Sequence, residues 1–337
     1  MSRRSWLVIV ALAVLAVAGI VARLCVGGEH WGLPESGQFW ELRLLRAFSA
    51  AAVGVALGIA GVVVQSLLRN PLASPEVLGM SSGASLAVML GIYLESRLGV
   101  SGSGAGSGLW SVGIAGRGAA ALLGALAALW LVYALSQRNG VIEPASMVLV
   151  GVMVGIMCGA ATMFVQHLMP DRGFATAQLL LGALSDDTSW ATLSVIGIVV
   201  GCAGALACLL GDSMDAATLD DDEARSVGVR LSRLRACLFT LGGLLAACAV
   251  LLAGPVGFVG LVCPHAARVL LGRGGLSHRA LVVASGCAGA ALMTAADTMV
   301  KAADLSSGRM PIGVVTALVG GPAFLFILRR ERAARTS

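Results

Sequence analysis

Long apolar runs alternate with short polar segments along the whole chain. Most runs reach the length of about twenty residues that an α-helix needs to cross the hydrocarbon core of a membrane. Ten runs are present, at about residues 6–26, 44–68, 78–94, 118–135, 145–168, 190–210, 234–253, 254–271, 280–300 and 311–328. The pattern predicts an all-α polytopic membrane protein with about ten transmembrane helices, folded as a single domain over residues 1–337.

The run at 254–271 is broken by glycines and prolines. Gly254, Pro255 and Gly257 lie at its start, and Gly260 and Pro264 lie within it. Such residues are tolerated at membrane depth only where neighbouring protein satisfies the exposed backbone groups. We therefore expect an interrupted helix here, packed against the other helices.

Small residues recur at four-residue spacing, which lets two helix backbones approach closely in lipid. The examples are Gly54 and Gly58, Gly151 with Gly155 and Gly159, and Gly197 and Gly201. This spacing predicts a compact bundle. Each pair could serve packing within the chain or a seam between two copies.

The composition excludes several other classes of protein. The apolar set makes up 58% of the residues and charged residues only 12%, with a mean hydropathy of +0.90. Soluble domains carry about 25% charged residues, so a soluble chain of this composition could not cover its surface with polar groups. The 45 glycines follow no Gly-X-Y period, which excludes a collagen-like structure.

Arginine is concentrated on one side of the predicted membrane. With the N-terminus inside, the inner segments carry 15 of the 23 Lys and Arg residues; these segments are 1–5, 69–77, 136–144, 211–235, 268–279 and 329–337. Positively charged loops are retained in the cytoplasm. We therefore expect both termini to be cytoplasmic, with an even number of crossings.

Ionisable groups are nearly absent from the interior of the apolar runs. Asp297 is the one acid well inside a run, whereas proton- and ion-coupled carriers usually hold acids or histidines there. This disfavours an ion-coupled secondary carrier, which remains the alternative from a different class. The only lysine, Lys301, follows no glycine-rich phosphate loop, so the chain has no ATPase site of its own. Eight cysteines without a CxxC pair indicate small apolar residues rather than a metal site.

Polar stretches border the second predicted crossing at both ends. Arg43 and Arg46 lie one helical turn apart at the outer end and share a face. They could pair with carboxylates of an external partner or reach lipid phosphates. At the inner end, Pro71 and Pro75 end the helix and predict an extended turn, which could be a plain connector.

The longest charged inner loop covers residues 211–235. Four acids at 220–223 lie where a short helix would begin, which suits the helix dipole. Gly228 lies where a left-handed cap would end that helix. The loop therefore predicts a short capped helix that could dock on a cytoplasmic partner, with a solvated loop as the alternative.

Taken in order, these stretches resemble the permease family of type II ABC importers for iron-siderophores, haem and cobalamin (FecCD/BtuC-like permeases). RLLR at 43–46 resembles that family's RLPR, and RNPLASPEVLGMSSGAS at 69–85 matches its RNPLASPxxLGxxSGA signature. The other matching strings are LLLGAL at 179–184, DDEARSVGV at 221–229, GPVGFVGLVCPHAAR at 254–268, ADTMVK at 296–301 and MPIGVVTALVGGPAFLFILRR at 310–330. The resemblance covers about residues 40–330.

The resemblance implies a ten-helix subunit of the bacterial cytoplasmic (inner) membrane. It would pair with itself or with a paralogous permease around a central path. Two ATP-binding subunits on the inside would hold ATP and Mg²⁺, so this chain itself would need no cofactor. A substrate-binding protein would dock on the outside, and no nucleic acid is involved.

Site residues follow from the same resemblance. Arg43 and Arg46 fall on arginines that dock the binding protein, and Lys301 falls on a third such position that is usually arginine. The lysine keeps the charge but loses the bidentate fork. Asn70 and Leu72 fall on the cytoplasmic gate. The coupling helix that seats in the ATPase would contain Asp222, Glu223, Ala224, Arg225 and Gly228.

The substrate implied by the resemblance is a metal chelate. The strings NPLASPEVLG and SSGAS are closest to the iron-chelate members, which favours an iron(III)-siderophore. Haem is the first alternative and cobalamin the second. His167 and Met169, near the outer end of the fifth crossing, could touch haem in passage, although a simple role at the helix end is the stronger interpretation of these two residues. Transport would proceed by alternating access, in which the bundle rocks between two packings.

Overall fold

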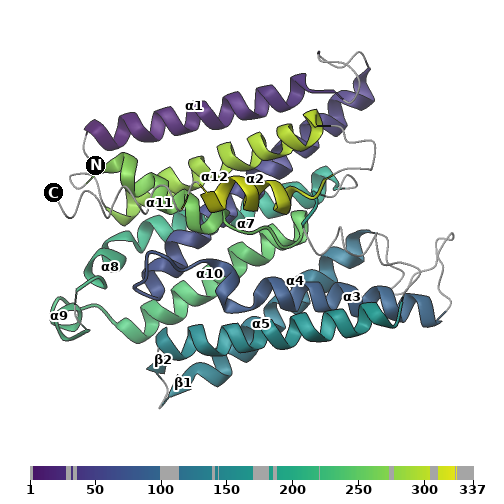
Figure 1. The fold of residues 1–337 in the computed structure, drawn as a ribbon. Coiled ribbons are helices and arrows are strands. Elements are labelled where there is room, and N and C mark those ends of the chain that lie inside the picture. Colours follow the sequence, from purple (N-terminus) through teal and green to yellow (C-terminus); the bar gives the residue numbers. More distant parts are fainter. Residues whose placement is uncertain are drawn as a thin grey trace.

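The fold is a bundle of long apolar helices (Figure 1), seen in a computed structural model. The structure describes residues 3–27, 32, 36–98, 114–138, 141–142, 144–169, 182–184, 188–219, 221–272, 277–303, 310–322 and 324. The apolar helices within these ranges are α1 (Arg3–Cys25), α2 (Gly37–Leu67), α3 (Met80–Leu98), α4 (Ile114–Ser136), α5 (Pro144–His167), α7 (Trp190–Leu209), α10 (Leu231–Ala253), α11 (Val259–Leu271), α12 (His278–Ala302) and the helix Ile312–Pro322.

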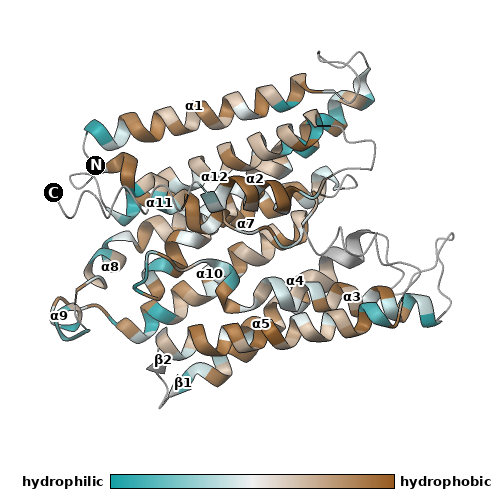
Figure 2. Cartoon of the chain, in the orientation of Figure 1, coloured by the Kyte–Doolittle hydropathy of each residue, from teal (hydrophilic) through white to brown (hydrophobic). Residues whose placement is uncertain are grey.

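Each of the ten predicted crossings coincides with one of these helices, so the predicted all-helical architecture is confirmed. Seven of the helices in the described ranges are long and apolar enough to span a membrane. Figure 2 shows their apolar character running along most of their length, with hydrophilic residues gathered toward the helix ends and the connections. The last part of the predicted crossing at 311–328 lies outside the described residues.

The short elements lie between the long helices. They are the 3₁₀-helix η1 (Pro75–Leu78), the helices α8 (Gly211–Ala216) and α9 (Asp221–Ser226), and the strands β1 (Gln137–Arg138) and β2 (Val141–Ile142). The two strands form an antiparallel pair that joins α4 to α5. The first turn of α1, the α8–α9 segment and this strand pair lie at the same end of the bundle (Figure 1). By the arginine distribution, this end is the expected cytoplasmic side.

The centre of the bundle is formed by α2, α10 and α12. Their membrane-length windows are 83%, 72% and 72% buried, whereas those of α1 and α5 are only 17% and 22% buried. Glycines allow the central helices to touch through their backbones. A Cβ at Gly54 would lie 2.1 Å from the carbonyl oxygen of Gly289, and one at Gly58 would lie 2.2 Å from that of Ser285. Close contact between α2 and α12 therefore depends on the missing side chains.

The interruption predicted at 254–271 is present. Helix α10 ends at Ala253, Gly254 has a φ of 65°, and α11 begins at Val259 with Pro264 inside it. Residue Phe258 before α11 has a φ of 70°, a left-handed conformation that is uncommon for a bulky side chain. Most of the first two turns of α11 are buried, which is where a broken helix can be tolerated in a membrane.

Candidate coupling, gate and docking sites

The gate segment, residues 69–78, folds back into the bundle after α2 ends. Pro75 in η1 packs on Gly260, whose missing Cβ would lie 2.6 Å from Pro75 and 3.2 Å from the carbonyl oxygen of Leu57. Leu57 lies about three turns before the end of α2. The segment is therefore packed among α2, α11 and α5. The sequence also allowed a plain connector here, and this packing shows that the segment is more than that.

The predicted gate residues lie at the tip of this segment. The side-chain oxygen of Asn70 accepts a hydrogen bond from the backbone N–H of Leu72 at 2.9 Å, and its backbone carbonyl accepts one from Ala73 at 3.1 Å. These bonds hold a tight turn of the kind that asparagine favours. Leu72 is 48% exposed. Both residues are thus exposed on the surface of the chain.

Gln65 fastens the gate segment to its neighbours. Its amide nitrogen donates to the carbonyl oxygen of Ala73 at 3.2 Å, and its amide oxygen accepts from Arg268 of α11 at 2.6 Å. Gln65 is buried, where a polar side chain needs such partners. The gate segment is therefore held to both α2 and α11.

The coupling loop, residues 211–235, contains the predicted short capped helix. It is α9, and Gly228 ends it with a φ of +91°. Asp222 and Arg225 pair with each other across one turn at 3.2 Å, and their side chains are 91% and 63% exposed. Ala224 is fully buried against its own chain, whereas Val227 is 67% exposed. A docking partner would therefore meet the charged pair and Val227, with Ala224 serving as the inner packing contact.

Asp221, the first residue of α9, is partly exposed and pairs with arginines of two other segments. One of its carboxylate oxygens lies 2.6 Å from Nη2 of Arg69 and 2.9 Å from Nη2 of Arg235. Partial burial alone would raise the pKa of Asp221, but the guanidinium groups of Arg235 and Arg69 outweigh it and hold the pKa below its usual value. The carboxylate is therefore charged at neutral pH. The sequence alone does not single out Asp221, because it is one of four consecutive acids.

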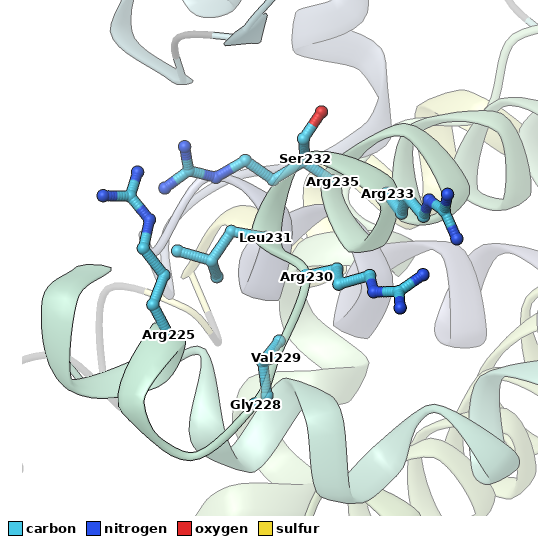
Figure 3. Close-up of a pocket in the computed structure, with 8 residues that line it drawn as sticks. All are labelled: Arg225, Gly228, Val229, Arg230, Leu231, Ser232, Arg233 and Arg235. Carbon is cyan, nitrogen blue, oxygen red and sulfur yellow. The ribbon is translucent and has the colours of Figure 1, made fainter.

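A basic groove lies beside α9, between that helix and the start of α10 (Figure 3). It encloses about 500 Å³ and is lined by Arg225, Gly228, Val229, Arg230, Leu231, Ser232, Arg233 and Arg235. Two of its four arginines are paired within the chain, Arg235 with Asp221 and Arg225 with Asp222. The groove extends the polar surface of the coupling loop with positive charge, which suits contact with an acidic surface.

The outer arginines make contacts within the chain. Nη1 of Arg43 donates to the carbonyl oxygens of Leu24 at 2.7 Å and Gly32 at 2.8 Å. Lys301 is half-buried in the last turn of α12. Arg43 thus satisfies the carbonyl oxygen of Leu24, one of those that α1 leaves open at its C-terminal end.

Asp297 is fully buried and accepts from two arginines. Nη2 of Arg46 lies 2.9 Å from it, and Arg23 of α1 forms a second ion pair with it. The side chains of Arg23 and Arg46 are 3% and 12% exposed. This buried cluster joins α1, α2 and α12. It accounts for the one acid found inside an apolar run, and Arg23 is a partner that the sequence analysis did not single out.

The described residues contain no group of three or more His, Cys, Asp or Glu side chains that could hold a metal ion. The eight cysteines are free thiols; Cys248 and Cys263 are buried and Cys202 is exposed. His167 is exposed at the end of α5, whereas Met169 is buried. These two residues are therefore not presented together on one open surface.

Comparison with known proteins agrees with this architecture. The model of the FecCD transport family matches residues 5–330. The cobalamin import system permease BtuC of Halobacterium salinarum is 33% identical over 302 residues, covering 89% of this chain and 76% of that protein. The hemin transport permease HmuU of Yersinia pestis is 31% identical, covering 91% and 88%, and the vitamin B12 permease BtuC of Klebsiella pneumoniae is 31% identical, covering 98% and 95%.

A solved structure has the same fold. It is described as an inward-facing metal-chelate type ABC transporter, and it superposes with a TM-score of 0.81 at 25% identity, covering 96% of this chain and 99% of that one. The family match spans nearly the whole chain and includes the gate segment, the coupling loop and the broken α10–α11 stretch. ATP is hydrolysed by separate subunits in such importers, in keeping with the missing phosphate loop. This chain belongs to the FecCD transport family and is a permease subunit of an ABC importer.

Proposed function

We propose that this permease carries an iron(III)-siderophore complex across the bacterial cytoplasmic membrane, with both termini in the cytoplasm and residues 1–337 acting as one permease domain. The observation that carries the substrate class is the solved metal-chelate type transporter, which matches nearly the whole chain. The strings NPLASPEVLG and SSGAS favour an iron chelate within that class. Cobalamin is the second candidate, because two of the relatives are cobalamin or vitamin B12 permeases.

As part of this proposal, the exposed side of α5 faces the path and holds a large chelate weakly during passage. Met153, Met157 and Met163 are each more than half exposed on this helix. Methionine side chains are flexible and polarizable, so they adapt to different shapes without fixing one ligand. Haem is less favoured as a substrate, since Met169 is buried while His167 is exposed.

In the proposed cycle, two permeases form a dimer with two ATPase subunits below it and one binding protein above it. ATP binding closes the ATPase pair, and the coupling helices move with it. In this chain the surface presented to the ATPase is formed by Asp222, Glu223 and Arg225, while Ala224 and Gly228 shape the helix. Asn70 and Leu72 open and close the inner end of the path as the bundle moves between two packings.

The function is tested by reconstituting the complex in liposomes with its ATPase and binding-protein partners. We expect ATP-dependent accumulation of a radioiron-loaded hydroxamate siderophore, with labelled cobalamin and haemin as the competing probes. Accumulation of cobalamin or haemin instead would overturn the proposed substrate, and the assignment as an ATP-driven importer would stand. If uptake of the probes required an ion gradient and did not require ATP, the ABC mechanism would be overturned.

The docking role of the outer cations needs its own test. Replacing Arg43 with glutamate should weaken binding of the substrate-binding protein about tenfold or more, because an attraction becomes a repulsion. Affinity is measured on the purified complex by surface plasmon resonance. Arg46 is a poorer choice for this test, since a glutamate there would face the buried Asp297.

The matched control is Arg97→Glu, which reverses the charge of an exposed arginine that stacks over Tyr93 near the end of α3. That variant should bind normally. Equal losses of affinity for the two variants would show that the Arg43 effect is a general charge effect, and normal binding by Arg43→Glu would remove Arg43 from the docking surface.

A further inference from the structure

We propose that Asp221 is a positioning residue that ties the coupling helix α9 to the gate segment through Arg69. The inference rests on the proposed function of α9 as the ATPase contact and of Asn70 as a gate residue. It adds a physical connection between these two parts of the chain. The site residues expected from the sequence include neither Asp221 nor Arg69.

The tie consists of one carboxylate between two arginines from different elements. Arg69 follows α2 and contacts Asp221 at 2.6 Å, and Arg235 in α10 donates to both carboxylate oxygens at 2.9 and 3.0 Å. Asp221 therefore joins the start of α9 to the neighbouring helix α10 and to Arg69, which lies about 150 residues earlier in the sequence. Asp222, the next residue, pairs instead with Arg225 inside α9.

Both ends of the tie are held by their own surroundings. Ala224 anchors α9 on the bundle, since it is fully buried one turn after Asp221. On the other side Arg69 has a φ of 49°, a left-handed conformation that a non-glycine residue keeps only when its surroundings require it. The N–H of the next residue, Asn70, donates to the carbonyl oxygen of Gln65 at 3.1 Å. A displacement of α9 is therefore passed to a backbone with little freedom to absorb it.

The gate lies directly beyond this connection. Asn70 is the residue after Arg69, and its side chain orders the turn to Leu72. When an ATPase partner moves α9, the Asp221 carboxylate pulls on Arg69, and the turn that carries both gate residues moves with it. Arg235 keeps the carboxylate aimed at Arg69 during this motion.

The tie is partly exposed, with Asp221 and Arg69 side chains at 34% and 33%. Ion pairs at such positions add little to folding stability. We therefore expect the loss of the tie to uncouple the two sites without unfolding the protein. This makes the inference testable with single neutral substitutions.

The test compares Asp221→Asn, Arg69→Gln and the double variant in the reconstituted complex. The measured quantity is the amount of chelate transported per ATP hydrolysed. The radioiron-loaded siderophore, cobalamin and haemin are first tried on the wild-type complex, and the probe that it accumulates is then used for every variant. We expect each single variant to lower this ratio about fivefold or more while ATP hydrolysis continues. The double variant should lose no more than the singles, because both remove the same bond.

Two further variants separate positioning from a general effect. Asp212→Asn removes another ion pair of the same loop, that with Arg279 of α12, and it should keep the wild-type ratio. Asp221→Glu keeps the charge and should recover most of the ratio. Co-purification of the ATPase subunits and the thermal unfolding midpoint should be unchanged in all variants.

An unchanged ratio in Asp221→Asn would overturn the tie, and so would additive losses in the double variant. An equal loss in Asp212→Asn would also overturn it, because the effect would then belong to the whole loop. A wild-type complex that transports none of the three probes with ATP would instead contradict the proposed function. The two failures are therefore distinguishable.

Discussion

Replacing Asp297 with asparagine should destabilise the chain by about 3–5 kcal/mol, because it leaves two buried arginines without a counter-charge. The side chains of Arg23 and Arg46 are 3% and 12% exposed and both pair with this carboxylate. Asparagine is nearly the same size, so the loss would come from charge and hydrogen bonding. The expected result is a lower unfolding midpoint in detergent. It is measured by heating the protein and determining the fraction that remains monodisperse.

The charges in this cluster also predict the order in which single substitutions lower the stability. Arg23→Met removes one cation and leaves a neutral pair of Arg46 and Asp297, so it should cost less than Asp297→Asn. Adding Arg23→Met to Asp297→Asn should recover part of the loss, since one unpaired buried charge disappears. If Arg23→Met proved more damaging than Asp297→Asn, unpaired charge would not be the main source of the instability.

Replacing Gly54 with alanine should destabilise the chain by about 1–3 kcal/mol, although alanine is the better helix former. The added Cβ would lie 2.1 Å from the carbonyl oxygen of Gly289 and 2.7 Å from the backbone nitrogen of Ala290. Backbone atoms cannot rotate away as a side chain can, so α2 and α12 would have to separate. The thermal midpoint and the yield of folded protein measure the effect.

Gly197→Ala is the matched control for Gly54→Ala. Gly197 also lies mid-helix at small-residue spacing, but a Cβ there would meet no described residue within 4 Å. Gly197→Ala should leave stability unchanged or raise it slightly, since the helix propensity improves. Equal losses for the two variants would count against the backbone contact between α2 and α12 as the cause.

The helices could be predicted well from the sequence because membrane helices follow a local rule. Each crossing needs about twenty apolar residues whatever its neighbours are. The short cap at Gly228 and the break at Gly254 were also predictable. Glycine adopts a positive φ easily and proline lacks a backbone N–H, and both are properties of single residues. Residues that act locally thus revealed their structure without knowledge of the fold.

Contacts between distant segments could not be predicted in this way. Gly54 and Gly197 belong to the same sequence pattern, yet Gly54 touches another backbone and Gly197 touches none of the described residues. Asp221 and Asp222 are adjacent acids, yet one ties α9 to Arg69 and the other lies on the surface. A helix turns by about 100° per residue, so neighbours in the sequence point in different directions. The rotation of each helix in the bundle decides which of them is buried.

The sequence by itself determined that the chain is a polytopic helical membrane protein with few charges in its crossings, without an ATPase motif, and with a capped inner loop. These features depend on the local cost of exposing polar groups to lipid and on the types of residue present. Only the tertiary structure decided that Asp297 serves two arginines, that Ala224 faces inward, and that Asp221 reaches the gate segment. Each of these contacts joins residues more than a hundred positions apart or depends on the rotation of a helix. A local sequence pattern encodes neither the distant pairing nor the rotation.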